Sequence, residues 1–434
     1  MKKMKKLIGV GKDFLFKNNG PTQILFKNTF WLMFSELFNK GLMLLLTIFL
    51  ARYLGSEGYG EFTFALSFTL LLVVACDFGL TTYSTREMSK KREDTNMFVN
   101  NVLLIKLVLT LITLGICLFF LSFFQGKTFF EKSLVFVMTF YVIINTFNEF
   151  FRAVFRSHER MEYEAYSKII QAVALFSLAI FFIFFQYSAL YVAFAYVFGV
   201  SLSFLFCYFI VTKKFGTIRY LPDKVFIKKI LLETWPFALS SIFVSIYFSI
   251  DSLFISFFKG DSALGQYSVA YMLITALYII PTVLTNAYFP KFSELFGKKK
   301  EREIPKFLNL FILKVTVIII PLCIILYFLA TFLIETLYSQ AYSEAILPFK
   351  ILLLALFFKF YSFPFGFLLS AMNQQMTRLK IQGFTSLLNI GTNLYFIPYY
   401  GIVGAAITTV ISEGVLLGFY FVYAMSMLRK NGSR

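Results

Sequence analysis

Long apolar stretches recur along the chain and alternate with short polar segments. A helix that crosses a bilayer needs about 20 mostly apolar residues. Six such stretches in the first half are residues 30–50, 59–84, 98–124, 133–155, 166–186 and 189–212. Six more in the second half are residues 233–257, 264–290, 307–330, 346–371, 377–398 and 401–427. The pattern predicts an all-α polytopic membrane protein with about 12 transmembrane helices. Residues 331–345 form either a loop or a short interfacial helix.

Composition excludes soluble domains. Apolar residues make up 59% of the chain and charged residues 15%, with a mean hydropathy of +0.75, whereas soluble proteins carry roughly 25% charged residues. The four cysteines fall in apolar stretches without metal-ligand spacing, and the single histidine, His158, lies in a charged loop. We therefore predict no metal site and no catalytic residue.

The net charge of +18 would suit nucleic-acid binding, but its placement indicates membrane topology. With the N-terminus inside, the cytoplasmic segments and adjoining helix ends hold 32 of the 41 Lys and Arg residues, and the external loops hold four. This is the positive-inside pattern. We expect a multi-pass protein of the cytoplasmic membrane with both termini cytoplasmic and no nucleic-acid partner. Residues 1–29 carry seven lysines and no apolar run, so no cleavable signal peptide is predicted.

The two halves resemble each other. Residues 50–65 (LARYLGSEGYGEFTFA) align with residues 254–270 (FISFFKGDSALGQYSVA), so that Gly55 matches Gly260 and Gly60 matches Gly265. Six is an even number of spans, so both halves enter the membrane from the same side, and the repeat is parallel. The predicted organisation is a basic N-terminal segment 1–29, a first lobe 30–215, a cytoplasmic linker 216–232, a second lobe 233–427 and a tail 428–434.

An ordered set of motifs resembles a known family. It comprises ARYLGSEGYGEFTFALSF, DFGLTTYSTREMSK, FRAVFRSHERMEYEAY, WPFALSSIFVSIYFSIDSLFIS, GQYSVAYMLITALYIIPTVLTNAYFPKFSEL and IPYYGIVGAAITTVISEG. From about residue 25 to the C-terminus, the chain resembles polysaccharide flippases of the multidrug/oligosaccharidyl-lipid/polysaccharide exporter superfamily. The resemblance implies two six-helix lobes facing each other in a V. It also implies transport of oligosaccharide units linked to a polyprenyl diphosphate across the membrane.

Charged residues inside spans are candidates for a site, because an unpaired charge facing lipid costs about 2.5–3.5 kcal/mol on insertion scales. Lys40 and Lys359 lie near the middle of their spans and are candidates for binding the substrate's phosphates. Lys106 and Lys314 either line the cavity that would bind these phosphates or extend their ammonium groups to the membrane interface. Arg52 is either a substrate contact or an interfacial anchor. For Lys40 the alternative is an ion pair with Glu36, four residues earlier.

Asp77, Asp251 and Glu413 are carboxylates predicted inside spans. Each either couples transport to protons or sodium or pairs with a basic residue; for Asp77, pairing with Arg86 or helix capping is the alternative. We expect a monomer without a cofactor, surrounded by membrane lipid, that acts with other polysaccharide-assembly proteins.

Two other functions are considered. A cation-coupled multidrug exporter would have the same number of helices. The lysines inside the spans of this chain, however, would repel cationic drugs. A membrane polymerase or ligase would need catalytic groups on a large external loop. The longest external loop, 331–345, offers Glu335 and Glu344 without histidine or arginine.

Overall fold

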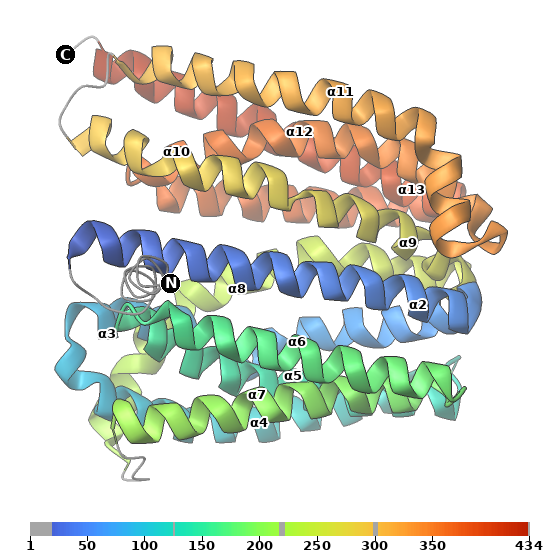
Figure 1. The fold of residues 1–434 in the computed structure, drawn as a ribbon, viewed down its shortest axis with the longest axis horizontal. Coiled ribbons are helices and arrows are strands. Elements are labelled where there is room, and N and C mark those ends of the chain that lie inside the picture. Colours follow the sequence, from blue (N-terminus) through green and yellow to red (C-terminus); the bar gives the residue numbers. More distant parts are fainter. Residues whose placement is uncertain (1–19, 125, 217–221, 298–302, 433–434) are drawn as a thin grey trace, which may run out of the picture. The chain divides into compact units, whose positions relative to one another are not determined.

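The computed structural model describes residues 20–124, 126–216, 222–297 and 303–432, which are almost entirely helical (Figure 1). The elements up to the linker are α2 (Pro21–Asp77), α3 (Leu80–Lys90), η1 (Arg92–Asp94), α4 (Thr95–Phe123), α5 (Phe129–Ser157), α6 (Met161–Phe184) and α7 (Ala189–Lys214). After it come α8 (Lys224–Lys259), α9 (Asp261–Leu277), α10 (Ile279–Gly297), α11 (Ile304–Tyr338), η3 (Gln340–Ala345), α12 (Ile346–Ala371) and α13 (Gln375–Gly432).

Ten helical stretches of the described chain are long and apolar enough to cross a membrane, and two of these are double spans. The stretches Gln23–Asp77 and Gln375–Leu428 contain 55 and 54 residues. A straight helix of that length would measure about 80 Å, against a hydrocarbon core of about 30 Å. Each stretch is interrupted by a glycine with a positive φ, Gly55 (φ 68°) in the first and Gly401 (φ 58°) in the second. Glycine adopts such conformations without steric cost. Each stretch therefore supplies two spans, which gives the twelve predicted.

Two predicted spans are interrupted, and the stretch that was predicted as a loop or a short interfacial helix is helical. The span 59–84 breaks where Phe78 and Gly79 adopt left-handed conformations between α2 and α3. The span 264–290 breaks at Tyr278, between α9 and α10. In the stretch 331–345, α11 continues to Tyr338 and the 3₁₀ segment η3 follows.

Contacts divide the chain into two compact units. The first comprises residues 1–46 and 69–241, and the second comprises residues 47–68 and 242–434. The predicted lobe limits, 30–215 and 233–427, stay predictions, since units defined by packing need not follow the repeat.

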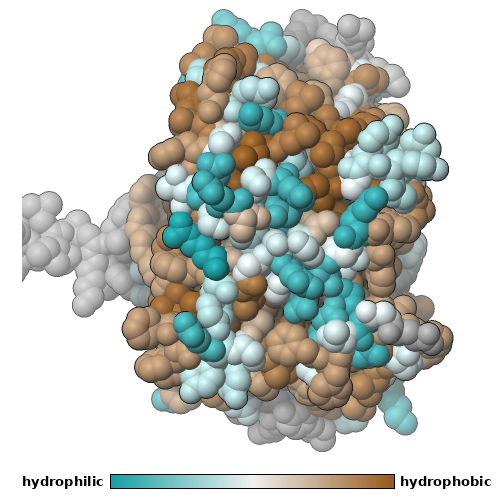
Figure 2. Space-filling view, turned by 90° about the vertical axis from the view of Figure 1, so that its right-hand side faces the viewer, coloured by the Kyte–Doolittle hydropathy of each residue, from teal (hydrophilic) through white to brown (hydrophobic). Residues whose placement is uncertain are grey.

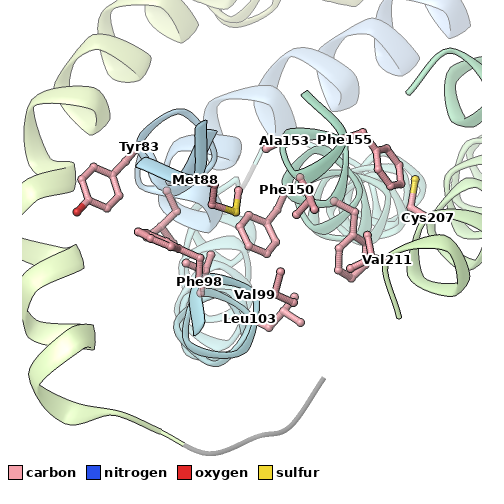
Figure 3. Packing of buried hydrophobic residues seen from close by; sticks show 14 of the residues in the cluster. Tyr83, Met88, Phe98, Val99, Leu103, Phe150, Ala153, Phe155, Cys207 and Val211 are labelled. Carbon is pink, nitrogen blue, oxygen red and sulfur yellow. The ribbon is translucent and has the colours of Figure 1, made fainter. Parts of the chain in front are cut away.

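In the first unit, α5 packs against α3, α4, α6 and α7. It begins with a capping box, in which the Thr128 hydroxyl accepts from the Glu131 amide and the Glu131 carboxylate accepts from the Thr128 amide. At its other end, Phe150 and Phe155 join a buried cluster with Met88 of α3, Phe98 of α4 and Val211 of α7 (Figure 3). The free thiol Cys207 lies in this cluster as an apolar core residue.

In the second unit, α12 packs against α9, α10, α11 and α13. Many of its residues are buried, although Leu347 and Leu354 are exposed. Lys359 is among the buried residues, so it must find its partners among the neighbouring helices.

The repeat is visible in the backbone of the second unit. Gly55 (φ 68°, ψ 179°) and its counterpart Gly260 (φ 84°, ψ 173°) have nearly the same conformation. The turns that contain them contact each other reciprocally. A Cβ on Gly60 would lie 1.7 Å from the carbonyl oxygen of Asp261, and a Cβ on Gly265 would lie 1.9 Å from that of Ser56. Each glycine thus meets the backbone four residues before its counterpart, as expected for a pseudo-two-fold contact.

The surface pattern agrees with a membrane-spanning fold. In the end-on view of Figure 2, hydrophilic residues gather over the end face, and hydrophobic residues dominate around it. Such a distribution suits helix ends that emerge from a bilayer into water.

Candidate functional site

Asp77 and Lys106 form a buried ion pair where α2 ends. The Lys106 ammonium donates to Asp77 Oδ1 at 2.6 Å, and the side chain is fully buried. Asp77 also accepts from the amide and hydroxyl of Thr81, so it caps the first turn of α3. Of the roles predicted for Asp77, helix capping is therefore observed. The basic residue that pairs with Asp77 is Lys106. Arg86 pairs with Glu87 instead.

Glu36 and Lys40 do not form the expected i,i+4 ion pair. Glu36 accepts from Lys168 of α6 at 3.2 Å, and Lys168 also pairs with Glu164 at 3.1 Å. Lys40 is half-buried, and it has no ion-pair partner among the residues that the structure describes. The predicted ion pair between Lys40 and Glu36 is therefore not formed, because Glu36 pairs with Lys168 instead.

A charged cluster that was not predicted from the sequence includes Glu36 and Lys168. Arg152 of α5 donates to Glu149 at 2.5 Å, to the Ser167 hydroxyl at 2.6 Å and to the Gln171 carbonyl at 2.7 Å. Arg156, one turn further, donates to Glu164 at 3.0 Å. The sequence signal was the spacing Glu149, Arg152, Arg156, which places three charges on one side of α5.

Lys359 lies at the centre of the second unit and is paired. Its ammonium donates to Glu413 Oε1 of α13 at 2.5 Å, and Tyr247 of α8 donates to the same oxygen at 2.6 Å. Four aromatic rings have their centroids 5.2–5.8 Å from the ammonium: those of Tyr247, Phe248, Tyr278 and Phe363. The lysine borders a cavity of about 70 Å³ with Gln382, Thr385 and Ser386. Lys359 thus lines a small cavity whose other walls include the apolar Phe243, Val244 and Leu416, but its charge is already balanced.

Of the three acids predicted inside spans, Asp77 and Glu413 pair with lysines, whereas Asp251 is contacted by neutral groups. It is 6% exposed and accepts from Asn393 at 2.5 Å, from Thr409 at 3.1 Å and from Tyr267 at 3.3 Å. All of these donors are neutral. The Oδ1 atom of Asn393 is buried without a hydrogen-bond partner in the described structure. Asp251 therefore has no basic partner among its printed contacts and lies next to an unused amide oxygen.

Arg52 and Lys314 have partners of other kinds. The Arg52 guanidinium donates to the carbonyls of Leu337, at 2.7 Å, and Thr336, and so caps the end of α11. Lys314 is exposed and donates to the Tyr288 hydroxyl at 2.8 Å.

His158 lies directly after α5, and its Nδ1 is 3.0 Å from the Val154 carbonyl oxygen. Burial lowers the pKa of this imidazole. A neutral, hydrogen-bonded ring that closes the last turn of a helix has a structural role.

Comparisons with known proteins identify the family. Residues 25–296 match the family described as polysaccharide biosynthesis protein, and residues 236–395 match the family described as MatE. An uncharacterized membrane protein of Methanocaldococcus jannaschii, MJ1068, is 22% identical, with 93% of this chain and 84% of that protein covered.

Two solved structures show the same fold. The lipid II flippase MurJ in an inward closed conformation superposes with a TM-score of 0.74 at 16% identity, covering 90% of this chain and 86% of MurJ. An inward-facing multidrug resistance transporter of the MATE family has a TM-score of 0.73 at 16% identity, covering 90% and 96%. The family match extends over more than half of the residues, and the fold agrees with it. The chain therefore belongs to the polysaccharide biosynthesis protein family, within the superfamily that the sequence resemblance indicated.

Proposed function

We propose that the protein is a flippase that moves oligosaccharide units linked to a polyprenyl diphosphate across the cytoplasmic membrane by alternating access. The family match, the MATE fold and the likeness to a lipid II flippase support this class of substrate. The amphiphilic substrate keeps its tail in lipid while its phosphates and sugars need a polar route. A cation within a span supplies a counter-charge for the phosphates where screening is weak.

The observation that carries the proposal is the unpaired charge of Lys40. The polar cluster that engages Glu36 holds three cations, Arg152, Arg156 and Lys168, and three carboxylates, Glu36, Glu149 and Glu164. Each of these cations has a carboxylate partner, whereas Lys40, one helical turn after Glu36, has none among the described residues. A half-buried cation without an internal partner is suited to bind an anion that arrives from outside the protein.

Replacing Lys40 with alanine should lower transport by about tenfold to hundredfold, because a hydrogen bond to a charged group contributes about 1.5–3 kcal/mol. Lys40→Arg should retain most of the activity, since it keeps the charge. The measurement is surface polysaccharide in cells with equal amounts of each variant in the membrane. Lys132→Ala removes a lysine of the predicted external side and is the matched control. Normal export by Lys40→Ala would refute the role of Lys40 in binding phosphate.

We further propose that Asp251 couples transport to a cation. Carboxylate, amide and hydroxyl oxygens are the ligands that hard cations prefer, and these groups meet at Asp251, Asn393 and Thr409. Asp77 and Glu413 are less suited to this role, because each already has a lysine partner.

Asp251→Asn should remove the dependence of transport on an ion gradient while keeping the fold, because asparagine has nearly the same shape and can still form hydrogen bonds. The measurement is transport into proteoliposomes with an imposed sodium or proton gradient. One of the two gradients should accelerate the native protein, and neither should accelerate the variant. Glu344→Gln, at an exposed position, serves as control. An Asp251→Asn variant that still follows the gradient would contradict the assignment.

Export of drugs is the second candidate function. The match of residues 236–395 to the MatE family and the aromatic rings around Lys359 favour it. The ion pair with Glu413 would reduce the repulsion that we expected between Lys359 and a cationic drug. Deletion of the gene separates the candidates: loss of surface polysaccharide supports the flippase, whereas drug sensitivity with normal polysaccharide supports the exporter.

A further inference from the structure

The ion pair between Lys359 and Glu413 is electrically neutral, but its hydrogen bonds are incomplete. The Lys359 ammonium and the Tyr247 hydroxyl both donate to Glu413 Oε1, at 2.5 Å and 2.6 Å. The other carboxylate oxygen, Oε2, is buried and accepts no hydrogen bond within the described structure. A buried carboxylate oxygen without a donor is unfavourable unless it is protonated or bound by another group. Glu413 therefore has an oxygen that is free to take a proton.

The cavity beside this pair has room for an anion. Its volume is about 70 Å³, which is enough for a few water molecules or one small oxyanion. Part of its wall is apolar, and the rest carries the uncharged hydrogen-bond donors of Gln382, Thr385 and Ser386. Lys359 is the charged residue among those that line it. An anion in this cavity would therefore meet an ammonium group and neutral donors.

Aromatic rings hold the ammonium in place independently of the carboxylate. The centroids of the Tyr247, Phe248, Tyr278 and Phe363 rings lie 5.2–5.8 Å from Lys359 Nζ. Cation–π attraction to several rings stabilises a cation that is withdrawn from water. The lysine can therefore stay charged and in position when its carboxylate partner is neutralised.

Charge balance links the anion to a proton. Because the resting pair is neutral, an anion that binds Lys359 adds negative charge to a buried site, which is unfavourable unless a positive charge enters with it. The titratable groups that face Glu413 are Lys359 of α12, Tyr247 of α8, Tyr271 of α9, Tyr278 directly after α9 and Tyr420 of α13. Tyr271 also interacts with Asp251 of α8. Lys359 is the only cation in this set at neutral pH. A proton on Glu413 is the direct way to restore the balance.

We propose that a phosphate or diphosphate group binds Lys359 in this cavity and that Glu413 takes up a proton from water when it does. The proposal rests on the proposed flippase function and adds a second phosphate contact, besides Lys40, at which binding depends on pH. The dependence is reciprocal, so a lower pH strengthens anion binding and a bound anion favours protonation. Asp251 differs from Glu413, because its donors are neutral and its availability to a cation does not require an anion.

Binding of ³²P-labelled pyrophosphate to the purified full chain tests the proposal. The protein carries Lys40→Ala, so that the remaining binding reports on Lys359. Glu413→Gln in the same background keeps the ammonium but removes the group that takes the proton, so it should bind pyrophosphate more tightly than the parent at high pH. The affinity of the parent relative to Glu413→Gln should rise by up to about tenfold for each pH unit lowered, the limit for one proton per anion. Titration of the ligand itself cancels in this ratio.

Two further variants serve as controls. Lys359→Met combined with Glu413→Gln removes both charges together and should not bind pyrophosphate. Lys350→Met removes another lysine of α12 and should bind as the parent does. If Glu413→Gln alone fails to fold, a pH indicator in weak buffer replaces the ratio. The parent should then take up about one proton for each anion bound, beyond the uptake by the ligand alone.

Three outcomes would overturn the inference. They are a ratio of affinities that does not change with pH (or no proton uptake), no pyrophosphate binding by the Lys40→Ala protein, and binding of pyrophosphate without binding of a labelled short prenyl diphosphate. The last result would assign the cavity to free phosphate, whereas binding of both ligands supports a lipid-linked one. Normal surface polysaccharide after deletion of the gene would instead refute the proposed function, whatever the binding results.

Discussion

Substitution of Gly60 or Gly265 by alanine should sharply reduce both the stability and the activity of the protein. In either case the new Cβ meets a backbone carbonyl oxygen at less than 2 Å, at 1.7 Å for Gly60 and at 1.9 Å for Gly265. Backbone atoms cannot rotate away as a flexible side chain can, so the two turns must separate. Overpacking in a tight contact costs about 1–3 kcal/mol. We expect a clear fall in the melting temperature of the purified protein in detergent.

The reciprocity of the contact gives this prediction a second part. Either substitution separates the same pair of turns, so the double variant should lose much less than the sum of the single losses. Gly115→Ala is the control, because no atom lies within 4 Å of a Cβ at that position. A melting temperature of Gly60→Ala equal to that of Gly115→Ala would be inconsistent with the close approach of the turns.

Breaking the Lys359–Glu413 pair should be at least as damaging to stability. Glu413 is 1% exposed and Lys359 is 7% exposed, so removal of one partner leaves a buried charge without compensation. Such losses are about 3–5 kcal/mol. We expect Lys359→Met and Glu413→Gln each to lower the melting temperature strongly, and the combined variant to recover most of the loss. Lys314→Met, at an exposed position, should have little effect on stability.

The combined variant also separates the structural role of Lys359 from a role in binding. If Lys359 contacts the substrate, the stable double variant will remain inactive in polysaccharide export. If the lysine only balances Glu413, export will return with stability. Single variants as stable as the native protein would show that the pair is not buried as described.

The sequence was sufficient for properties that depend on local composition. Hydropathy over 20 residues located the spans, since the energy of burying a helix in lipid is nearly a sum over its own residues. The repeat could be read from Gly55, Gly60, Gly260 and Gly265, because tight turns and close approach impose glycine locally. The breaks at Phe78 and Tyr278 were missed, because hydropathy does not report backbone conformation.

The partners of charged residues were much less predictable. Glu36 was expected to pair with Lys40 by helical spacing, but Lys168 is 132 positions away along the chain and lies nearer in space. Arg52 lies at a helix end in sequence, yet it caps a different helix. These pairings depend on how helices are packed, and no periodicity in a single segment encodes that. The free charge of Lys40 is a consequence of those distant pairings.

The reciprocal turns also bear on how such a chain arose. A contact that maps onto itself under a two-fold rotation is what two identical six-helix chains would form in a symmetric dimer, with one glycine from each subunit. Duplication and fusion of such a gene would place the glycine required at this contact at two positions of one polypeptide, Gly60 and Gly265. Elsewhere the copies were then free to diverge, while neither copy could exchange its glycine without disturbing the backbone of the other copy.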